Sequence, residues 1–397
     1  MFWTILHILD ILLWLCMAAS VAYILFFSLI YACRRHKPEG QSKPKGPGCR
    51  FLILYPAYKE DNVIIQSVSR FLLQDYPKEK YHITVISDHQ QPDTNSRLAA
   101  MPITLLTPDF KQSTKAKALQ YAMERNGFEA DYVVILDADN VVGTDFLSRL
   151  DACCAEGFGA IQCHRCAKNS DTDIAVLDGL SEEINNAIFR KAHNLVGLSS
   201  ALIGSGMCFG FSWFADHVTQ LQTAGEDREL EALLIHDAIY VHYADDILVY
   251  DEKVGNSDNF QRQRRRWMSA QINSLFTLLP HLAAAIGKRN INYIDKTVQQ
   301  MLIPRSLLLV STPAIAILLL FVTPVWSVKW WILCFLTCTA ISLSMPSRMR
   351  KSLLIAQSLT LFRLSWKMLR NLWHIDKDSK EFLHTEHHAD TKGQNLM

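Results

Sequence analysis

Three long runs without a charged side chain limit what this chain can fold into. They extend from Ile11 to Cys33, from Ser306 to Val328 and from Trp330 to Ser347. About 20 apolar residues in a helix are enough to cross the hydrocarbon core of a bilayer. Basic residues follow the first run, whereas a secretory signal peptide carries them before a shorter apolar stretch. The sequence therefore predicts an N-terminal transmembrane helix over 1–33 and two further transmembrane helices over 301–347.

The charges beside these runs predict how the chain is oriented. Six Lys or Arg residues against one Glu occupy 34–50, which the Pro and Gly content marks as a linker, and Arg348, Arg350 and Lys351 follow the third run. By the positive-inside rule both flanks are cytoplasmic. We therefore expect a multi-pass protein of the cell (plasma or inner) membrane, with the lipid bilayer as a partner and a cytoplasmic domain between the first and second spans.

The segment after the third run has a different character. Arg363, Lys367 and Arg370 recur at helical spacing within an otherwise apolar stretch. This pattern is typical of an amphipathic helix that lies on a membrane surface. We expect such an interfacial helix over 348–374 and a polar tail over 375–397.

The composition excludes several classes of protein. Hydrophobic residues make up 49% and charged residues 20% of the 397 positions, which is unlike a disordered chain. Ten cysteines are too few for a disulfide-built scaffold. With 40 Lys and Arg against 39 Asp and Glu the net charge is +1, so no global basic field indicates a nucleic-acid partner.

Between the first two runs, short apolar stretches alternate with polar stretches of helical periodicity. The expected strands are Phe51–Tyr55 (ended by Pro56), Tyr81–Ile86, Ile103–Leu106 and Tyr132–Leu136, and the expected helices are 63–73 and 115–125. Strands that alternate with helices form βαβ units, so we predict an α/β domain with a mostly parallel sheet over 51–257. In such sheets ligands bind beyond the carboxyl ends of the strands.

Carboxylates follow these strands where a ligand is expected. Asp88 follows the second strand, and Asp137 and Asp139 follow the strand at 132–136. Two carboxylates two residues apart can direct oxygen ligands to one Mg²⁺ or Mn²⁺ ion, which also favours diphosphate oxygens. The chain has no GxxxxGK[ST] or GxGxxG loop, so a Walker or Rossmann phosphate site is not expected. Acidic turns after strands are common, and this pair alone does not decide the function.

Two downstream features complete the candidate site. Asp227 stands near the start of a helical stretch, where it is either a helix cap or a base for a hydroxyl nucleophile. Arg262, Arg264, Arg265 and Arg266 then fall within five positions and cannot share one face of a helix. Some of them must meet phosphates, lipid headgroups or acidic side chains. We expect 258–300 to form amphipathic helices at the membrane interface.

Taken in order, these residues resemble the signature of processive family 2 glycosyltransferases, the inverting enzymes of the cellulose, chitin, hyaluronan and poly-N-acetylglucosamine synthase type. The resemblance covers about residues 50–350 and implies a GT-A nucleotide-sugar-binding domain. Pro56–Glu60 resembles the family's PxxNE segment, with Lys59 where Asn is usual, and Lys115–Gln120 is similar to its KAxALN helix. The D, DxD, (T/E)D and QxxRW motifs correspond to Asp88, Asp137-Ala138-Asp139, Glu226-Asp227 and Gln263-Arg264-Arg265-Arg266-Trp267.

The resemblance also implies roles for the matched residues. A UDP-sugar would be the donor, and Mg²⁺ or Mn²⁺ the cofactor, with Asp139 the more direct ligand. Asp227 would be the catalytic base, with Glu226 beside it. The implied nucleotide-sugar-binding residues are Tyr58, Glu60, Asp88, Lys115, Asp137 and Asp139, the last two also holding the metal. The implied acceptor- and diphosphate-binding residues are Gly204, Ser205, Gly206, Gln263, Arg266 and Trp267.

Several functions remain open at this point. The first is repeated addition to a β-linked polysaccharide of the capsule or exopolysaccharide type. The second is a single addition to a lipid acceptor such as a polyprenyl phosphate or a glycolipid. Three spans are fewer than large synthases with a sealed channel possess, so polymer export would require a homo-oligomer or an export partner. An inactive membrane scaffold and a basic membrane adaptor are the non-enzymatic alternatives.

Overall fold

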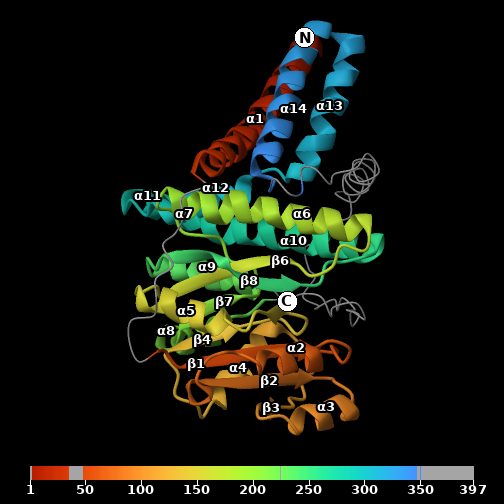
Figure 1. The fold of residues 1–397 in the computed structure, drawn as a ribbon. Helices are drawn as coiled ribbons and strands as arrows, with labels where there is room; N and C mark the ends of the chain where they lie inside the picture. Colours follow the sequence, from red (N-terminus) through yellow and green to blue (C-terminus); the bar gives the residue numbers. More distant parts are fainter. Residues whose placement is uncertain (1, 35–47, 224, 347–348, 350–397) are drawn as a thin grey trace. The chain divides into compact units, whose positions relative to one another are not determined.

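A computed structural model describes residues 2–34, 48–223, 225–346 and 349 (Figure 1). Most of the expected linker, the interfacial helix expected over 348–374 and the polar tail lie outside the described residues. The described chain forms two compact units, and each is treated by itself. We call residues 48–169 and 199–253 the sheet unit, and residues 2–34, 170–198 and 254–349 the helical unit.

The strands and helices of the two units have the following bounds. The strands are β1 (Phe51–Tyr58), β2 (Tyr81–Asp88), β3 (Thr104–Leu106), β4 (Tyr132–Ile135), β5 (Val141–Val142), β6 (Ala160–Ala167), β7 (Met207–Gly210) and β8 (Val241–Asp251). The helices of the sheet unit are α2 (Ile64–Phe71), η1 (Lys78–Lys80), α3 (Pro92–Ala99), α4 (Lys115–Glu124), α5 (Phe146–Ala155), α8 (Phe211–His217), η3 (Val218–Gln220) and α9 (Glu226–His236). Those of the helical unit are α1 (Phe2–Arg34), α6 (Asp173–Asn185), the π-helical η2 (Asn186–Lys191), α7 (Ala192–Leu195), α10 (Ser257–Leu278), η4 (Leu279–His281), α11 (Leu282–Gly287), α12 (Ile291–Met301), α13 (Arg305–Val322) and α14 (Pro324–Ser344).

The sheet confirms the predicted α/β fold with a mostly parallel core. Its eight strands have the order β3-β2-β1-β4-β7-β6-β8-β5. The pairs β3-β2, β2-β1, β1-β4 and β6-β8 are parallel, whereas β7 runs antiparallel to both β4 and β6. Consequently the carboxyl ends of β2, β1, β4 and β8 and the start of β7 lie at the same edge of the sheet.

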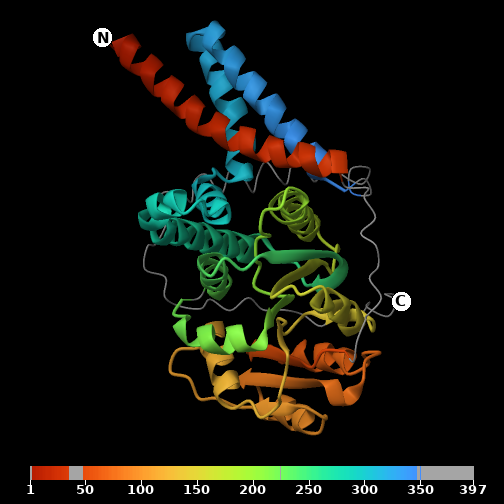
Figure 2. The same ribbon diagram turned by 90° about the vertical axis from the view of Figure 1, so that its left-hand side faces the viewer.

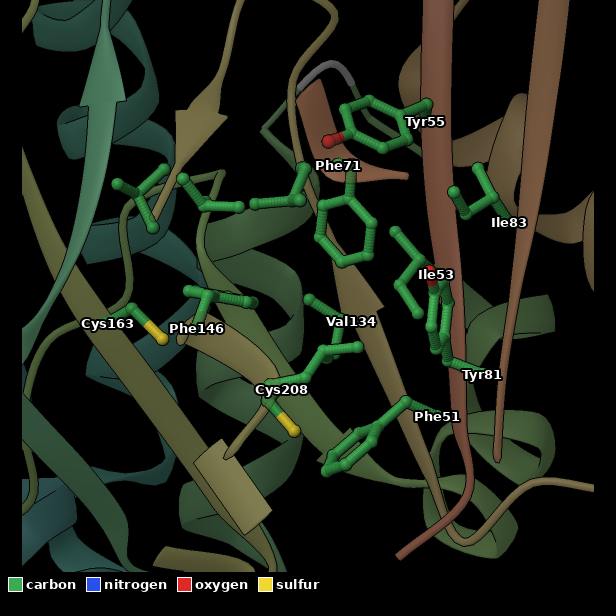
Figure 3. Packing of buried hydrophobic residues seen from close by; sticks show 14 of the residues in the cluster. Phe51, Ile53, Tyr55, Phe71, Tyr81, Ile83, Val134, Phe146, Cys163 and Cys208 are labelled. Atoms are coloured by element: carbon green, nitrogen blue, oxygen red, sulfur yellow. The ribbon is translucent and has the colours of Figure 1, made fainter. Parts of the chain in front are cut away.

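Both faces of the sheet are covered by helices, which explains why the sequences of its strands are continuous apolar runs. Phe51, Ile53 and Tyr55 of β1 are fully buried and point to one face, toward Phe71 of α2 and Phe146 of α5 (Figure 3). Alternate residues of the same strand face α4, α8 and α9 on the other side. Successive side chains of a strand point to opposite faces, so a strand buried on both faces needs apolar residues throughout.

The first strand is longer than predicted. We expected Pro56 to end it after Tyr55, but β1 continues to Tyr58 and pairs with β2 over its whole length. The Leu54 carbonyl accepts a hydrogen bond from the Leu136 N–H, so the backbone polar groups of Leu54 and Pro56 are directed toward β4. The strand β4 ends at Ile135, before it reaches Pro56. The missing N–H of Pro56 therefore removes no hydrogen bond from the sheet.

Three helices among the described residues of the helical unit are long and apolar enough to cross a membrane. They are Trp3–Arg34, Arg305–Val322 and Pro324–Ser344, which correspond to the three predicted spans. Val21 and Ile24 of α1 and Leu333 of α14 belong to one buried apolar cluster, and α1, α13 and α14 pack together in both views (Figure 1, Figure 2).

The boundary between the second and third spans was predicted wrongly. The uncharged runs place it at Lys329, but α13 ends at Val322 and α14 begins at Pro324, which supplies the fixed φ angle of a first helical residue. Lys329 lies inside α14, where its ammonium group contacts Asp10 Oδ2 of α1 and the other Asp10 oxygen accepts a 2.8 Å hydrogen bond from Trp330. Trp330 is fully buried.

One segment of the predicted catalytic domain packs with the helical unit. Residues 170–198 fall within the expected 51–257 domain, yet they form α6, η2 and α7, and Leu180, Ile184 and Ile188 join the apolar cluster of α1, α13 and α14. The expected helices over 258–300 are α10, α11 and α12. Their exposed apolar side chains include Ile272, Phe276, Ile286 and Ile291.

The end of α9 yields a prediction about stability. Ala238 has a φ of 57°, and the N–H groups of Ile239 and Ala238 bond to the carbonyls of Leu234 and Ile235 in the Schellman pattern. A side chain disfavours this left-handed conformation, so Ala238→Gly should stabilise the protein by about 1 kcal/mol. Ala232→Gly, inside the same helix, should destabilise it by a similar amount. Thermal unfolding of both variants checks this; equal effects of the two substitutions would contradict it.

Candidate active site

The shared edge of the sheet brings together polar residues from distant parts of the sequence. Asp88 ends β2 in register with Tyr58 at the end of β1, and Asp137 follows β4. Gly204–Gly206 precede β7, which runs the other way and so begins at this edge. Asp251 ends β8. The parallel strands and one reversed strand thus assemble the candidate active site from five segments.

Lys115 lies at the centre of these residues. The hydroxyl of Thr114 accepts a hydrogen bond from the N–H of Lys117, so it caps α4 and places Lys115 at the first helical position. The Lys115 ammonium donates to Asp137 Oδ1 at 2.5 Å and to the Gly204 carbonyl oxygen at 2.7 Å. Glu226 Oε1 lies 3.4 Å from the same nitrogen. Burial alone lowers the pKa of a lysine, but the charges of Asp137 and Glu226 outweigh burial and raise the pKa of Lys115 above its ordinary value.

Glu226 and Asp227 occupy the first turn of α9, the only part of that helix close to the site. Gly225 is the N-cap residue, so Asp227 is not the cap that we considered; its Oδ1 accepts a 2.8 Å hydrogen bond from the N–H of Arg228. Glu226 is 6% exposed, whereas Asp227 is half-buried. A carboxylate in the first helical turn is stabilised by the helix dipole and remains able to accept a proton from a hydroxyl.

The pKa of the Glu226 carboxyl is raised to about 7. Burial is the main cause, Lys115 opposes it, and the negative charges of Asp227 and Asp137 add to it. Glu226 therefore binds a proton near neutral pH, which reduces the repulsion among the three carboxylates around one ammonium group.

This pKa shift predicts how stability depends on pH. Because the folded state holds the Glu226 proton up to about pH 7, its stabilising contribution is fully present below the ordinary pKa of 4.5 and is lost as the pH rises through about 7. Glu226→Gln should remove this contribution, so its melting temperature should fall less than that of the wild type between pH 5 and pH 8. Thermal unfolding across this range tests it, with Glu229→Gln on the same helix as the control; equal slopes for wild type and Glu226→Gln would contradict the prediction.

The DxD segment is tied to β8 by a buried network. Asn140 donates to Asp139 Oδ1 and to Asp251 Oδ1, both at 3.2 Å, and its own Oδ1 accepts from the N–H of Asp137 at 3.0 Å. Asp139 Oδ2 accepts from the N–H of Glu252 at 2.8 Å, and Asp139 is only 2% exposed. These bonds hold the Asp139 carboxylate in one orientation.

The donor atoms around the DxD segment fit a divalent cation that is shared with a nucleotide. Asp137 and Asp139 offer hard carboxylate oxygens, which Mg²⁺ and Mn²⁺ prefer. Within the described ranges no group of three or more His, Cys, Asp or Glu side chains is arranged to hold a metal by itself. Mg²⁺ is usually held by one or two carboxylates together with substrate phosphates, and this pair has that composition.

The ends of β1 and β2 carry an unusual backbone. Lys59 and His89, the residues after the two strands, have φ angles of 55° and 57°. Asn adopts this conformation more readily than Lys, so the Asn that is usual at the position of Lys59 in the related enzymes has a structural explanation. Asp88 is buried, and its Oδ1 lies 2.5 Å from His89 Nδ1, whose ring packs edge-on against Tyr58. Glu60 accepts two backbone hydrogen bonds that begin the turn into α2.

The Gly204–Gly206 loop requires glycine at two positions. Gly204 and Gly206 have φ angles of 62° and 64°. A Cβ atom on Gly204 would lie 4.0 Å from the carboxylates of Glu226 and Asp227, and one on Gly206 would approach Val249 to 3.0 Å. The loop backbone therefore comes close to both carboxylates, and Ser205 between the glycines is fully buried.

The QxxRW residues belong to the helical unit. Gln263, Arg266 and Trp267 lie on α10 and are partly buried. Arg264 stacks on the Trp267 ring, with 4.5 Å from the guanidinium carbon to the ring centre, and donates to Asp178 of α6 at 2.7 Å. One face of the Trp267 ring is thus covered by an arginine.

The structure brings about half of the predicted residues of the sheet unit into one connected group. Direct contacts join Lys115 to Asp137, Gly204 and Glu226, with Asp227 beside Gly204, and Asn140 connects Asp137 to Asp139. Sequence reasoning missed Asn140 and Asp251, which orient Asp139. Asn140 directly follows the DxD motif, so the rule that ligands bind at strand ends was sufficient to find it. Asp251 ends β8, a strand that the sequence analysis did not predict.

With this geometry described, the comparisons with known proteins decide the family. The model of the family described as glycosyl transferase family group 2 matches residues 132–343, more than half of the chain. The chain belongs to this family. It is therefore a glycosyltransferase, as the sequence predicted. None of the curated proteins matches the chain significantly.

Several solved structures are similar to this family member, and the first of those described here shares its fold. A mannosyltransferase from Pyrobaculum calidifontis, in complex with GDP-Man and Mn²⁺, matches with a TM-score of 0.53 at 15% identity over 91% of this chain and 100% of its own. S. aureus TarS 1–349 in complex with UDP-GlcNAc matches at 0.43 and 12% identity over 81% and 92% of the two chains. Glucosyl-3-phosphoglycerate synthase from Mycobacterium tuberculosis matches at 0.42 and 16% identity over 60% and 84%.

Proposed function

We propose that this glycosyltransferase is membrane-bound and transfers a sugar from a UDP-sugar to a saccharide acceptor with inversion, forming a β-linked polysaccharide of the capsule or exopolysaccharide type. The observation that supports transfer is the cluster of Lys115 with Asp137, Glu226 and Asp227 at the edge of the sheet. The three long apolar helices support a membrane location, and the basic residues beside the first and third of them support a cytoplasmic location of the sheet unit.

In this proposal the residues of the sheet unit hold the donor and activate the acceptor. Tyr58, Glu60 and Asp88 bind the uridine and ribose, and Lys115 balances the charge of the neighbouring carboxylates. Asp227 removes the proton from the attacking sugar hydroxyl, whose ordinary pKa is far too high for it to ionise near pH 7. The base and the departing diphosphate lie on opposite sides of the anomeric carbon, so a single displacement inverts that centre.

Asp137 and Asp139 are proposed to hold Mg²⁺ or Mn²⁺ together with the diphosphate. When bound, the cation stabilises negative charge on the departing UDP. The network from Asn140 orients the Asp139 carboxylate for this role. Gln263, Arg266 and Trp267 of the helical unit are proposed to contact the acceptor and the diphosphate, and the Gly204–Gly206 backbone to lie beneath the acceptor sugar.

A second candidate is the single addition of a sugar to a lipid acceptor. The finding of three candidate spans among the described residues favours it, because a sealed path for a polymer through one chain needs more helices than three. Product length separates the two functions: repeated addition gives a ladder of sizes from one donor, and single addition gives one lipid-linked sugar. Repeated addition with export would need a homo-oligomer or an export partner.

The test uses the full-length protein in nonionic detergent and in lipid vesicles. It is incubated with labelled UDP-glucose, UDP-N-acetylglucosamine or GDP-mannose, the last because the mannosyltransferase with the shared fold binds it. Each donor is supplied with Mn²⁺, with Mg²⁺ or with a chelator, and the products are sized. We expect metal-dependent release of UDP and a sugar-containing product. A failure of every donor to release its nucleotide in the presence of acceptor lipids and oligosaccharides would overturn the proposal in favour of a scaffold.

A further inference from the structure

Three arginines of the helical unit meet along one stripe of α6 and the π-helical turn η2. They come from different elements: Arg190 from η2, Arg264 from α10 and Arg305 from the start of α13. The contacts are Arg264 to Asp178 at 2.7 Å, Arg305 to Asn185 Oδ1 at 2.7 Å and to the Ser181 carbonyl at 3.2 Å, and Arg190 to Glu182 at 3.0 Å and to Asn186 at 2.5 Å. Their partners recur every three or four residues, so they lie on one helical face.

Positive charge exceeds negative charge along this stripe. Within the described residues, the hydrogen-bonded partners of the three guanidinium groups include two carboxylates, those of Asp178 and Glu182, and Arg305 donates to a neutral amide and a carbonyl. Arg264, Glu182 and Arg190 are the charged groups that act most strongly on Arg305. Arg190 and Glu182 are almost fully buried, with side chains 4% and 2% exposed. A surplus charge in such surroundings is unfavourable unless an anion accompanies it.

Two guanidinium nitrogens in the stripe are available to such an anion. Arg305 Nη1 and Arg264 Nε are both buried, and neither has a hydrogen-bond partner in the part of the chain that the structure describes. Buried donors are nearly always paired, so each calls for an acceptor. Phosphate oxygens accept hydrogen bonds without donating any, and the planar fork of arginine matches them in charge and geometry.

We propose that Arg190, Arg264 and Arg305 form a binding site for a phosphate group. The phosphate belongs either to a lipid headgroup or to a free phosphate or diphosphate, which the site recognises by the same chemistry. Arg305 begins one of the three candidate spans, and the end of a span is the level at which lipid headgroups lie. The site is additional to the residues of the proposed function and does not depend on sugar transfer.

The test measures binding by the full-length protein in nonionic detergent, without any sugar donor. Dioleoylphosphatidic acid and inorganic pyrophosphate are the two phosphate probes, and dioleoylglycerol is the lipid without phosphate. Affinity is read by titration calorimetry and by the rise in melting temperature that a ligand of the folded state produces. Binding of phosphatidic acid alone identifies a lipid headgroup. Binding of pyrophosphate as well identifies a general phosphate site when the arginine variants described next weaken it, because the proposed donor site also takes a diphosphate. Both outcomes support the proposal.

Matched variants locate the site. Arg305→Gln removes a charge without leaving a carboxylate unpaired and should weaken binding of a phosphate probe at least about tenfold, as expected for a lost charge-assisted contact. Arg264→Gln is combined with Asp178→Asn for the same reason and should have a similar effect. Arg265→Gln, an exposed neighbour on α10, is the control and should bind as the wild type does.

Two results would overturn the proposal. One is a wild-type protein that binds neither phosphate probe more tightly than dioleoylglycerol. The other is an Arg305→Gln variant with wild-type affinity. If Arg305→Gln does not fold, Arg305→Lys is used instead, because it keeps the charge but lacks the planar guanidinium group. It should bind phosphate measurably more weakly than the wild type. Unchanged affinity would again contradict the site.

Discussion

Replacing Asp227 with Asn is expected to slow sugar transfer by about 10²–10⁴-fold, the range associated with a general base, while the protein still folds and binds its donor. Asn is nearly isosteric with Asp, and its amide oxygen can still accept the hydrogen bond that Asp227 Oδ1 receives from the Arg228 N–H. The amide cannot accept the proton of the attacking hydroxyl. The substitution therefore separates catalysis from structure.

Turnover and donor binding must both be measured to interpret the effect of Asp227→Asn. Single-turnover transfer gives the chemical step, and titration with the nucleotide sugar gives donor affinity, which should change by less than about threefold if Asp227 acts mainly in the transition state. Asp216→Asn, an exposed carboxylate on α8, is the matched control and should transfer sugar at the wild-type rate. Near-normal turnover of Asp227→Asn would show that another group is the base.

Replacing Lys115 with Met should cause the largest loss of stability. It removes the ammonium from between Asp137 and Glu226 and leaves the buried Glu226 and the partly buried Asp137 without a cation, and breaking a buried pair typically costs about 3–5 kcal/mol. For a protein of this size we expect the melting temperature to fall by roughly 10 °C. Lys117→Met is the control, because Lys117 is exposed on the same helix and bonds only to the Gln112 carbonyl in the described structure.

The effect of Lys115→Met should itself depend on pH. Glu226 binds a proton below about pH 7, which reduces the number of unpaired charges, so the loss of stability should be smaller at pH 6 than at pH 8. Adding Asp137→Asn to Lys115→Met should restore part of the stability, since one uncompensated carboxylate is removed. Equal melting temperatures for Lys115→Met and Lys117→Met would mean that the cluster does not stabilise the fold.

The sequence was sufficient to predict the α/β class and the carboxylates at the strand ends, because both are local. A buried strand appears in the sequence as an apolar run. The residue after it lies at the edge of the sheet, whichever strands pair beside it. The position of β7 was not predictable in this way. It inserts antiparallel between β4 and β6, and only long-range pairing places Gly204–Gly206 beside Glu226.

Charged residues were misinterpreted or overlooked in the sequence in two places. Lys329 interrupts an uncharged run and was taken as the end of a span, although Asp10, more than 300 residues away, allows it to lie within α14. Arg190 and Arg305 carry no motif and were overlooked. Arg305 reaches Asn185 of α6 from 120 residues away, and no spacing in the sequence encodes that contact.

The Asp10–Lys329 pair has a consequence for the order in which the chain is made. If α1 enters the bilayer as proposed, its carboxylate arrives long before the ammonium group that will meet it, since 319 residues separate them. At about 5–20 residues per second, ribosomes need tens of seconds to supply Lys329. Throughout that interval Asp10 has to remain in contact with water at the membrane surface, so the N-terminal end of α1 can settle into its final depth only after translation is nearly complete.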